Sequence, residues 1–398
     1  MFRPSRTTLA ILLPALAAVT LAACDSDAAG PDLSPDGGAG GRRSLATLEW
    51  NAIARGSIEK FKPNQQSAQR GMAYLTLAQY GVVDLVDRQF TRSGALQGAI
   101  AGASAVVLKY LYPADSAAFD AEVRTREAAL EPGRRIGFQG GEELGREIGA
   151  RAVAIARADR FDAPWNGTVP TGPGIWYSST VPATAPALPM LGQVQPFHMA
   201  AGNQFRPAPP PAFGSPAFLA AVAEVRGIAD TRTARQDSIA KFWAMGTGTL
   251  IAGFWNATAA ELIERNRLGE RESARALALM NTAAMDGLIA CADAKFTYWL
   301  LRPSQADPAI SLAIGLPNFP SYPSNHSCFS GSAAYLLGAL FPQDEQRLSG
   351  MAYDAGISRV LGGIHYRFDG DVGLQIARGV TQLALEGDRT NRLLGLLQ

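Results

Sequence analysis

Apolar residues recur every three or four positions from about Ser44 to the end of this chain, and this spacing limits the folds that it can adopt. Such spacing places apolar side chains on one face of a helix, which then packs against other helices. Strict two-residue alternation, which is typical of a half-buried strand, never persists. We therefore predict an all-α fold built from helical bundles. The periodicity is clearest in residues 72–86, 96–111, 239–250, 261–301, 329–340 and 372–385.

One long stretch, residues 161–216, interrupts the helical pattern. Pro, Gly and aromatic residues crowd together there, and Pro209, Pro210 and Pro211 are consecutive, so the stretch cannot be regular helix. It is either a linker between two bundles or an ordered segment packed over one bundle. Its aromatic residues, among them Trp176, favour the ordered segment.

The first 24 residues have the features of an export signal. Arg3 and Arg6 form a basic start, an apolar run follows over residues 9–21, and Leu-Ala-Ala-Cys closes the signal at Cys24. This ending resembles the bacterial lipobox, in which the cysteine becomes the lipid-bearing N-terminus after cleavage. A plain secretory peptide or a short membrane anchor is the alternative, and each of these readings exports the protein.

We accordingly expect three parts in the chain. These are a lipoprotein signal peptide and lipobox in residues 1–24, a flexible linker rich in Asp, Gly, Pro and Ser in residues 25–44, and a helical domain in residues 45–398. The expected location is the periplasmic or cell-surface side of a bacterial membrane, with attachment through the lipid. No later segment reaches about 18 uninterrupted apolar residues, so the sequence predicts no other membrane attachment.

The 36 basic and 35 acidic residues of the chain nearly cancel. No general field therefore attracts nucleic acid or an anionic membrane, and any functional positive charge must be local. With Cys24 assigned to lipid, only Cys291 and Cys328 remain, which are too few for a disulfide scaffold or a zinc site. A single bridge between these two cysteines stays open.

A first cationic motif lies in the helical pattern of residues 289–301, which Pro303 is expected to end. Lys295 and Arg302 are seven residues apart, so one helix would present both on nearly the same face. Two cations near a helix end are often a solvated surface. Here the residues around them are largely apolar, which predicts a buried helix whose charges need an anionic partner.

A second motif, Pro323-Ser324-Asn325-His326, comes directly before an apolar helix expected over residues 328–340. Ser324 is well placed to cap that helix, and capping alone would be a purely structural role. A helix N-terminus with free amides and a hydroxyl is also an anion site, and His326 falls in the first turn. The backbone amide of Asn325 would point at such an anion.

A third motif contains Arg359 and His365, separated by five residues that include Gly362 and Gly363. On one continuous helix the two side chains would point in different directions, so the glycines must break the helix for both to reach one site. Asp369 lies four residues after His365. Its carboxylate can accept a hydrogen bond from one ring nitrogen and leave the other nitrogen free.

Histidine is rare in this chain, with three residues in all, and two of them fall in these motifs. Titratable side chains grouped with cations are typical of functional sites. His198 has no charged or hydroxyl residue beside it, and we expect it to be structural.

Taken in order, the three motifs resemble the signature motifs shared by type 2 phosphatidic acid phosphatases (PAP2), bacterial non-specific acid phosphatases and vanadium-dependent haloperoxidases. Phe-Pro-Ser-Tyr at residues 319–322 and His-Tyr-Arg-Phe-Asp at residues 365–369 favour the haloperoxidase branch. The second motif departs from the family at Asn325, where glycine is usual. The resemblance extends weakly back to Trp50, and it implies the all-α fold of these proteins.

The resemblance implies vanadate as the cofactor, bonded to a ring nitrogen of His365, with hydrogen peroxide and a halide as substrates. His326 would be the catalytic acid/base, and Asp369 would orient His365. Phe319 matches the residue typical of chloride-oxidising members, which makes it a candidate for the halide site. The groups implied to bind the oxyanion are Lys295, Arg302, Ser324, Asn325 through its amide, and Arg359.

The same residues would also serve a PAP2-type acid phosphatase that needs no vanadate. His365 would then be the nucleophile that forms a phosphohistidine from a small phosphate ester, and His326 would protonate the leaving oxygen. Two other classes stay open. One is a non-catalytic lipoprotein that retains the fold; the other is a divalent-metal hydrolase using His326, His365 and Asp369, for which more carboxylates and fewer cations are usual.

Overall fold

Helices make up nearly all of the regular structure of this chain. The computed structural model describes residues 45–89, 93–245 and 248–398, and within them the only strand-like pairing is an isolated bridge between Ile175 and Leu300. The predicted all-α fold is therefore confirmed. The predicted signal peptide with Cys24 and the linker of residues 25–44 lie outside the described residues.

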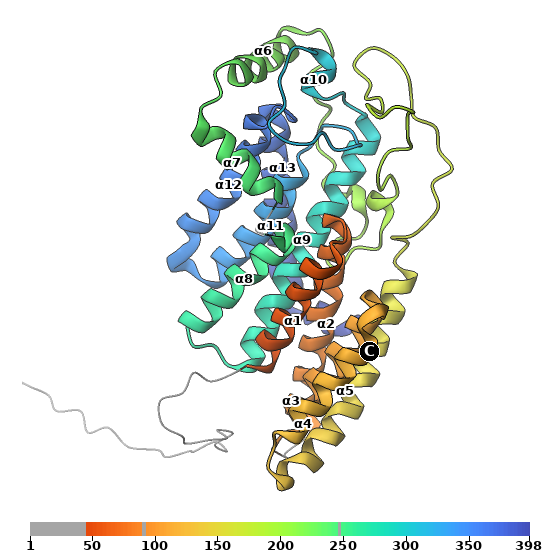
Figure 1. The fold of residues 1–398 in the computed structure, drawn as a ribbon, viewed down its shortest axis with the longest axis vertical. Helices are drawn as coiled ribbons and strands as arrows, with labels where there is room; N and C mark the ends of the chain where they lie inside the picture. Colours follow the sequence, from red (N-terminus) through yellow and green to blue (C-terminus); the bar gives the residue numbers. More distant parts are fainter. Residues whose placement is uncertain (1–44, 90–92, 246–247) are drawn as a thin grey trace, which may run out of the picture. The chain divides into compact units, whose positions relative to one another are not determined.

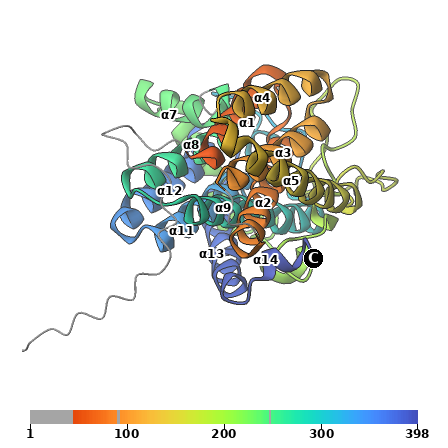
Figure 2. The same cartoon turned by 90° about the horizontal axis from the view of Figure 1, so that it is seen from below.

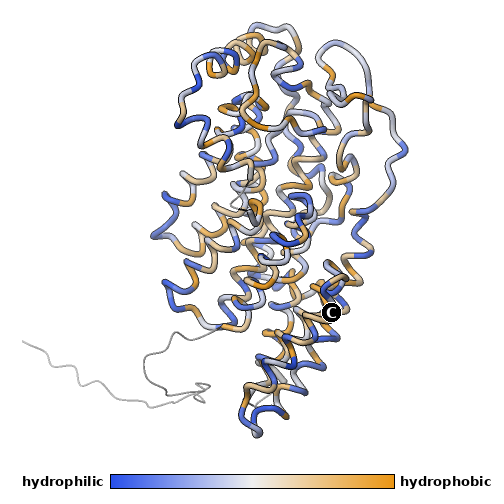
Figure 3. The backbone as a smooth tube through the Cα atoms, viewed as in Figure 1, coloured by the Kyte–Doolittle hydropathy of each residue, from blue (hydrophilic) through white to orange (hydrophobic). Residues whose placement is uncertain are grey.

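Fourteen α-helices follow one another along the described residues (Figure 1). Hydrophobic residues (orange) and hydrophilic residues (blue) alternate along these helices in Figure 3, as expected for amphipathic helices. No helix in the described part of the chain combines the length and apolarity needed to cross a bilayer. The helices are α1 (Ala46–Phe61), α2 (Gln65–Gln89), α3 (Ala95–Leu111), α4 (Ser116–Ala128), α5 (Pro132–Ala158), α6 (Pro216–Asp230), α7 (Ala234–Met245), α8 (Leu250–Arg265), α9 (Glu270–Tyr298), α10 (Pro303–Ala306), α11 (Asn325–Leu340), α12 (Glu345–Leu361), α13 (Arg367–Arg389) and α14 (Arg392–Gly395).

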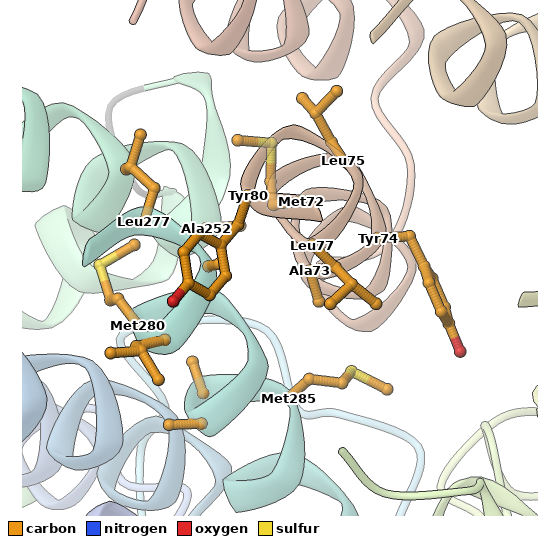
Figure 4. Packing of buried hydrophobic residues seen from close by; sticks show 14 of the residues in the cluster. Met72, Ala73, Tyr74, Leu75, Leu77, Tyr80, Ala252, Leu277, Met280 and Met285 are labelled. Atoms are coloured by element: carbon orange, nitrogen blue, oxygen red, sulfur yellow. The ribbon is translucent and has the colours of Figure 1, made fainter. Parts of the chain in front are cut away.

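Helix α9 lies at the centre of the bundle and contacts α2, α8, α11 and α13 (Figure 2). Most of its residues between Ser273 and Lys295 are buried, polar ones included, because neighbours surround it. Figure 4 shows the hydrophobic cluster that α9 shares with α2 and α8. The C-terminal turn of α9 carries Lys295, so the central helix places this side chain in the interior.

Helices α3 and α5 pack with their backbones in contact along a row of glycines. A Cβ atom added to Gly98 would lie 2.0 Å from the carbonyl oxygen of Phe138, and one added to Gly141 would lie 1.9 Å from that of Ala95. No side chain larger than hydrogen fits at either position. These glycines therefore set the distance between the two helices.

The Pro-rich stretch between α5 and α6 is ordered and packs on the bundle. Trp176 is 1% exposed and Phe197 is 3% exposed. The buried carboxylate of Asp286 on α9 accepts hydrogen bonds from the amides of Phe197, His198 and Met199 at 2.8–3.0 Å. Of the two predicted alternatives, the structure thus shows the ordered segment and not a linker between bundles.

Two of the predicted helical segments contain breaks. Residues 239–250 belong to two helices, because α8 begins only at Leu250, whose φ is 60°. Gly248, just before it, has a φ of 89°, a left-handed conformation that interrupts a helix. Residues 261–301 likewise belong to α8 and α9, with the break near Arg267 at a φ of 53°.

The predicted helix over residues 289–301 also ends early. Helix α9 stops before Trp299, whose φ of 51° is left-handed. Arg302 therefore does not share a helix with Lys295 and instead forms the N-cap of α10. The single-helix prediction was wrong because the apolar residues that follow Trp299 continue the periodic pattern after the backbone has turned.

Cys291 on α9 and Cys328 on α11 are both buried and both free. Burial, followed by a hydrogen bond in which the Cys328 thiol is the donor and Cys291 the acceptor, raises the pKa of Cys328 well above its ordinary value. The bridge that the sequence left open is thus not formed in this structure, and both buried side chains pack as small apolar groups.

Candidate active site

The three predicted motifs meet in one buried region, although they come from different helices. Lys295 lies in the last turn of α9, Arg302 at the N-cap of α10 and Arg359 in the last turn of α12. His365 lies just before α13, and its Nε2 is 2.9 Å from Nη1 of Arg302. Burial, followed by the charges of Arg302, Lys295, His326 and Arg359, lowers the pKa of His365 well below its ordinary value. A neutral imidazole is thus placed among three cations.

Asp369 holds the His365 ring through the predicted hydrogen bond. Nδ1 of His365 lies 2.7 Å from Oδ2 of Asp369 and donates to it, because an ionised carboxylate only accepts. The same oxygen accepts from Oγ of Ser321 at 2.6 Å and from the amide of Tyr366 at 3.2 Å. Burial raises the pKa of Asp369 to about 6, so the carboxylate is ionised at neutral pH. With the proton of His365 on Nδ1, Nε2 is the acceptor of the hydrogen bond from Nη1 of Arg302, so an oxyanion that bonds to Nε2 would have to replace this hydrogen bond.

Arg302 is fully buried, yet one of its nitrogens has no partner. Nε donates to the carbonyl of Phe319 at 3.0 Å, and Nη1 donates to the carbonyl of Ile364 at 2.8 Å and to His365. Nη2 makes no hydrogen bond within the described residues. Burial lowers the pKa of Arg302 to about 10, which leaves the guanidinium charged at neutral pH. A buried cation with an unpaired donor is suited to bind an anion.

Lys295 is also buried, but its ammonium group is directed at the turn before α11. Nζ donates to the carbonyls of Pro320 at 3.0 Å, Ser321 at 2.6 Å and Pro323. These bonds use all three ammonium hydrogens. Burial lowers the pKa of Lys295 to about 8. In this arrangement Lys295 stabilises the turn that leads to Ser324, and direct contact with an oxyanion would require the exchange of at least one of these bonds.

The ring of Phe319 covers both cations of the first motif. Its centroid lies 5.3 Å from Nζ of Lys295 and 5.1 Å from the guanidinium carbon of Arg302. The face of an aromatic ring attracts a cation at this distance. Phe319 therefore shields two buried charges from solvent on one side.

Ser324 occupies the N-cap position of α11 but does not cap the helix. Its side chain makes no capping hydrogen bond, and its buried Oγ has no partner among the described residues. The purely structural role considered for Ser324 is therefore wrong, because a capping hydroxyl would accept from an amide of the first turn. Oδ1 of the neighbouring Asn325 is also buried and unpartnered. Two unsatisfied oxygens thus lie at the N-terminus of α11.

His326 and Arg359 are both oriented by backbone carbonyls of α7. Nε2 of His326 donates to the carbonyl of Trp243 at 3.0 Å, so Nδ1 is unprotonated in the neutral ring. Burial and the charge of Arg359 lower the pKa of His326 well below its ordinary value. Arg359 donates to the carbonyl of Ala240 at 2.8 Å and to Oγ of Ser358 at 3.0 Å. Burial lowers the pKa of Arg359 to about 9.

A cavity of about 370 Å³ opens onto this region. Lys295, Arg302 and Ser324 are buried beside it and do not form part of its lining. The predicted site residues that line it are Phe319, Asn325, His326, Arg359 and His365.

These groups fit a tetrahedral oxyanion such as phosphate or vanadate. Nη2 of Arg302 and Oγ of Ser324 are unpartnered donors, and Nε2 of His365 carries a lone pair that an oxyanion would take over from Nη1 of Arg302. The oxygens of an oxyanion accept hydrogen bonds from such donors, and its central atom accepts an electron pair. Within the described residues, no three His, Cys, Asp or Glu side chains come together as ligands for a metal ion.

The sequence did not indicate Ser321, whose hydroxyl donates to Asp369 and lies 3.4 Å from Nδ1 of His365. Ser321 stands 48 positions from Asp369, and only the fold brings the two together.

His198, which was expected to be structural, lies elsewhere in the core. Its Nε2 pairs with Oγ1 of Thr282 at 2.8 Å, and burial lowers the pKa of His198 to about 3.

A sequence comparison matches residues 275–392 to the PAP2 superfamily. This range contains all three motifs, so the resemblance to the PAP2 and haloperoxidase superfamily is confirmed. A comparison with curated proteins gave no match.

The fold is similar to that of vanadium-dependent haloperoxidases. A bacterial vanadium-dependent iodoperoxidase is 20% identical, with a TM-score of 0.74 over 86% of this chain and 95% of that one. An apo-type bacterial vanadium-dependent chloroperoxidase is 15% identical, with a TM-score of 0.67 over 83% and 94% of the two chains. A holo-type chloroperoxidase is 14% identical, with a TM-score of 0.63 over 84% and 93%. At these identities the likeness establishes the fold.

Proposed function

We propose that this chain, whose residues 275–392 match the PAP2 superfamily, is a vanadium-dependent haloperoxidase-like enzyme that oxidises a halide with hydrogen peroxide. The observation that carries the proposal is a pair of buried, unpartnered donors: Nη2 of Arg302, whose Nη1 contacts Nε2 of His365, and Oγ of Ser324, whose backbone amide donates to the carbonyl of Asp369. The likeness to vanadium-dependent iodoperoxidase and chloroperoxidase structures supports vanadate as the oxyanion.

His365 is the proposed ligand of vanadate, through Nε2. The hydrogen bond to Asp369 keeps the proton on Nδ1, and the lowered pKa of His365 keeps the ring neutral around pH 6.5, where a solvent-exposed imidazole is about half protonated. Ser321 and the amide of Tyr366 fix the carboxylate in turn. When bound, vanadate would supply the Lewis acidity that activates peroxide towards the halide.

The cations and the N-terminus of α11 are proposed to hold the oxyanion oxygens. Nη2 of Arg302 and Oγ of Ser324 are ready to donate without breaking an existing hydrogen bond. Arg359 and Lys295 add positive charge, which acts strongly because the surroundings are buried. The backbone amide of Asn325 belongs to the first turn of α11, where the helix dipole favours an anion.

His326 is the proposed acid/base. Its Nε2–H is committed to the carbonyl of Trp243, so Nδ1 is the atom that takes and returns a proton. Because the pKa of His326 is lowered, its ring is neutral and can accept a proton while no anion is bound. An anion bound beside His326 would raise this pKa, so that the ring keeps the proton it accepts. Phe319 lines the same cavity, which supports its proposed place near the halide.

A PAP2-type acid phosphatase is the second candidate, and the match of residues 275–392 favours it. Nε2 of His365 would attack the phosphorus of a small phosphate ester, so that an N–P bond forms while the P–O bond to the leaving group breaks. Nδ1 of His326 would protonate the leaving oxygen. A non-catalytic lipoprotein that retains the fold would show neither activity.

Two assays on the same purified chain separate these candidates. We expect the vanadate-loaded protein to brominate a phenolic dye in the presence of bromide and hydrogen peroxide, and His365→Ala to abolish this activity. His326→Ala should lower kcat by about 100-fold or more. Hydrolysis of a phosphate monoester by the vanadate-free protein, without any peroxide-dependent bromination, would establish the phosphatase instead.

A further inference from the structure

The cavity that opens onto His365 is larger than a tetrahedral oxyanion requires. Its volume of about 370 Å³ lies within the range of about 300–1,000 Å³ typical of sites for small organic molecules. A water molecule takes about 30 Å³ of the liquid, so a five-atom oxyanion displaces on the order of two or three waters. Most of the cavity is therefore available to another molecule.

The rest of the lining is mainly apolar and belongs to well-packed parts of the bundle. Leu288 of α9 and Phe329 of α11 are at most 2% exposed, so these walls are held by the core. Among the described residues, no Asp, Glu or Lys lines the cavity. An uncharged apolar molecule would gain free energy from burial here. The apolar lining includes Leu250, Leu288, Ile314, Phe319, Phe329 and Ile364.

Gln65 adds a polar group from α2, a helix that carries none of the three motifs. Its Oε1 accepts from the amide of Ile251 at 3.3 Å, which fixes the orientation of the side-chain amide. Its Nε2 is buried and has no partner among the described residues. A bound molecule with a hydrogen-bond acceptor would satisfy this donor.

We propose that this cavity, here called the acceptor chamber, binds an uncharged organic molecule with an apolar, ring-sized body and a hydrogen-bond acceptor that meets Nε2 of Gln65. The inference rests on the proposed haloperoxidase function, in which the bound molecule is the halogen acceptor. The halide gives two electrons to peroxide, a C–H bond of the acceptor breaks and a carbon–halogen bond forms. The two peroxide oxygens leave as two water molecules, whose four hydrogens are the two of hydrogen peroxide, the proton from the C–H bond and one further proton.

Binding of 2-naphthol to the vanadate-free full-length chain, followed by fluorescence, tests the chamber without turnover. We expect saturable binding of one molecule per chain. Ala244→Phe adds a ring to an exposed alanine of the lining and should weaken binding at least tenfold. Ala234→Phe, at an exposed alanine in the first turn of α7 outside the lining, is the matched control and should leave the affinity unchanged.

Gln65→Glu isolates the polar contact. It keeps an oxygen that accepts from Ile251 and replaces the Nε2 donor with a second acceptor. We expect the affinity for 2-methoxynaphthalene, whose ether oxygen only accepts, to fall by about 3- to 10-fold, as for the loss of one hydrogen bond. The proposed binding to the acceptor chamber would be contradicted if 2-naphthol showed no saturable binding to the wild-type chain. An Ala244→Phe variant with the same affinity for 2-naphthol as the wild-type chain would also contradict it.

Iodide oxidation separates this inference from the proposed function, because formation of triiodide needs no organic acceptor. If the vanadate-loaded wild-type chain forms triiodide while 2-naphthol shows no saturable binding, this outcome would support the haloperoxidase function and contradict the acceptor chamber. Binding of 2-naphthol without triiodide formation would retain the chamber as a binding site and reject the haloperoxidase. Bromination of bound 2-naphthol that persists with excess methionine, a scavenger of free hypobromous acid, would support halogen transfer inside the chamber.

Discussion

Lys295 shows what burial does to a cation whose hydrogen bonds all go to backbone carbonyls. Burial lowers its pKa to about 8, compared with about 10.4 for an exposed lysine. The ammonium charge is therefore present below about pH 8 and is lost as the pH rises through that value. Since Lys295 lies beside the proposed anion site, the loss of its charge should weaken anion binding.

We predict that the affinity of the vanadate-free protein for molybdate, which stays a dianion in this range, falls by up to tenfold between about pH 8 and pH 9. Calorimetric titrations at several pH values measure this dependence. Lys295→Met should bind molybdate more weakly at pH 7 and should lose the change around pH 8. An affinity of the wild-type protein that stays constant from pH 7 to pH 9 would contradict a role for this charge.

Ser324 offers a second prediction, because its hydroxyl has no intramolecular partner. Ser324→Ala should leave the free energy of unfolding nearly unchanged and should weaken molybdate binding roughly tenfold or more, as expected for a hydrogen bond to a charged group. Ser215, which does cap α6 by accepting from Phe218 at 3.2 Å, is the matched control. Ser215→Ala should cost about 1 kcal/mol of stability and leave the anion affinity unchanged. The opposite pattern at Ser324, lost stability with unchanged affinity, would contradict its proposed role in anion binding.

At the scale of the elements, the contact between α3 and α5 gives a prediction about stability. Gly141→Ala would place a Cβ 1.9 Å from the carbonyl oxygen of Ala95 and force the helices apart, so we expect a loss of about 2 kcal/mol or more. Gly56→Ala in α1, where an added Cβ meets nothing within 4 Å, should instead stabilise the protein by about 0.5–1 kcal/mol. Chemical denaturation measures both values. If the two substitutions changed the free energy of unfolding equally, the close packing of α3 against α5 would be contradicted.

The helices were largely predictable from the sequence because each one has a periodic apolar face. Their ends were less predictable. The turn at Trp299 carries no Gly or Pro, and the apolar residues that follow it continue the helical pattern, so nothing local signals that α9 has ended. The break between α12 and His365 was predictable, since Gly363 adopts the left-handed φ of 80° that the pair of glycines suggested.

At the scale of the whole molecule, the sequence revealed the motifs but not the groups that position them. The pairing of His365 with Asp369 followed from their spacing of four residues. The contribution of Ser321 to that pair, and the carbonyl of Trp243 in α7 that orients His326, depend on the path of the entire bundle. The chamber wall formed by Gln65 lies more than 200 positions from the motifs, and no local pattern marks it. The export signal and lipidation at Cys24 stay predictions.

His365 and its neighbours are proposed to form a binding site for one oxyanion. Calorimetric titration of orthovanadate into the purified chain tests this most directly. We predict one vanadate per chain, displaced by phosphate, with binding lost in His365→Ala and retained in His326→Ala, whose side chain is proposed to move protons and not to bind the metal. Vanadate affinity that is unchanged in a folded His365→Ala variant would contradict the proposed binding site.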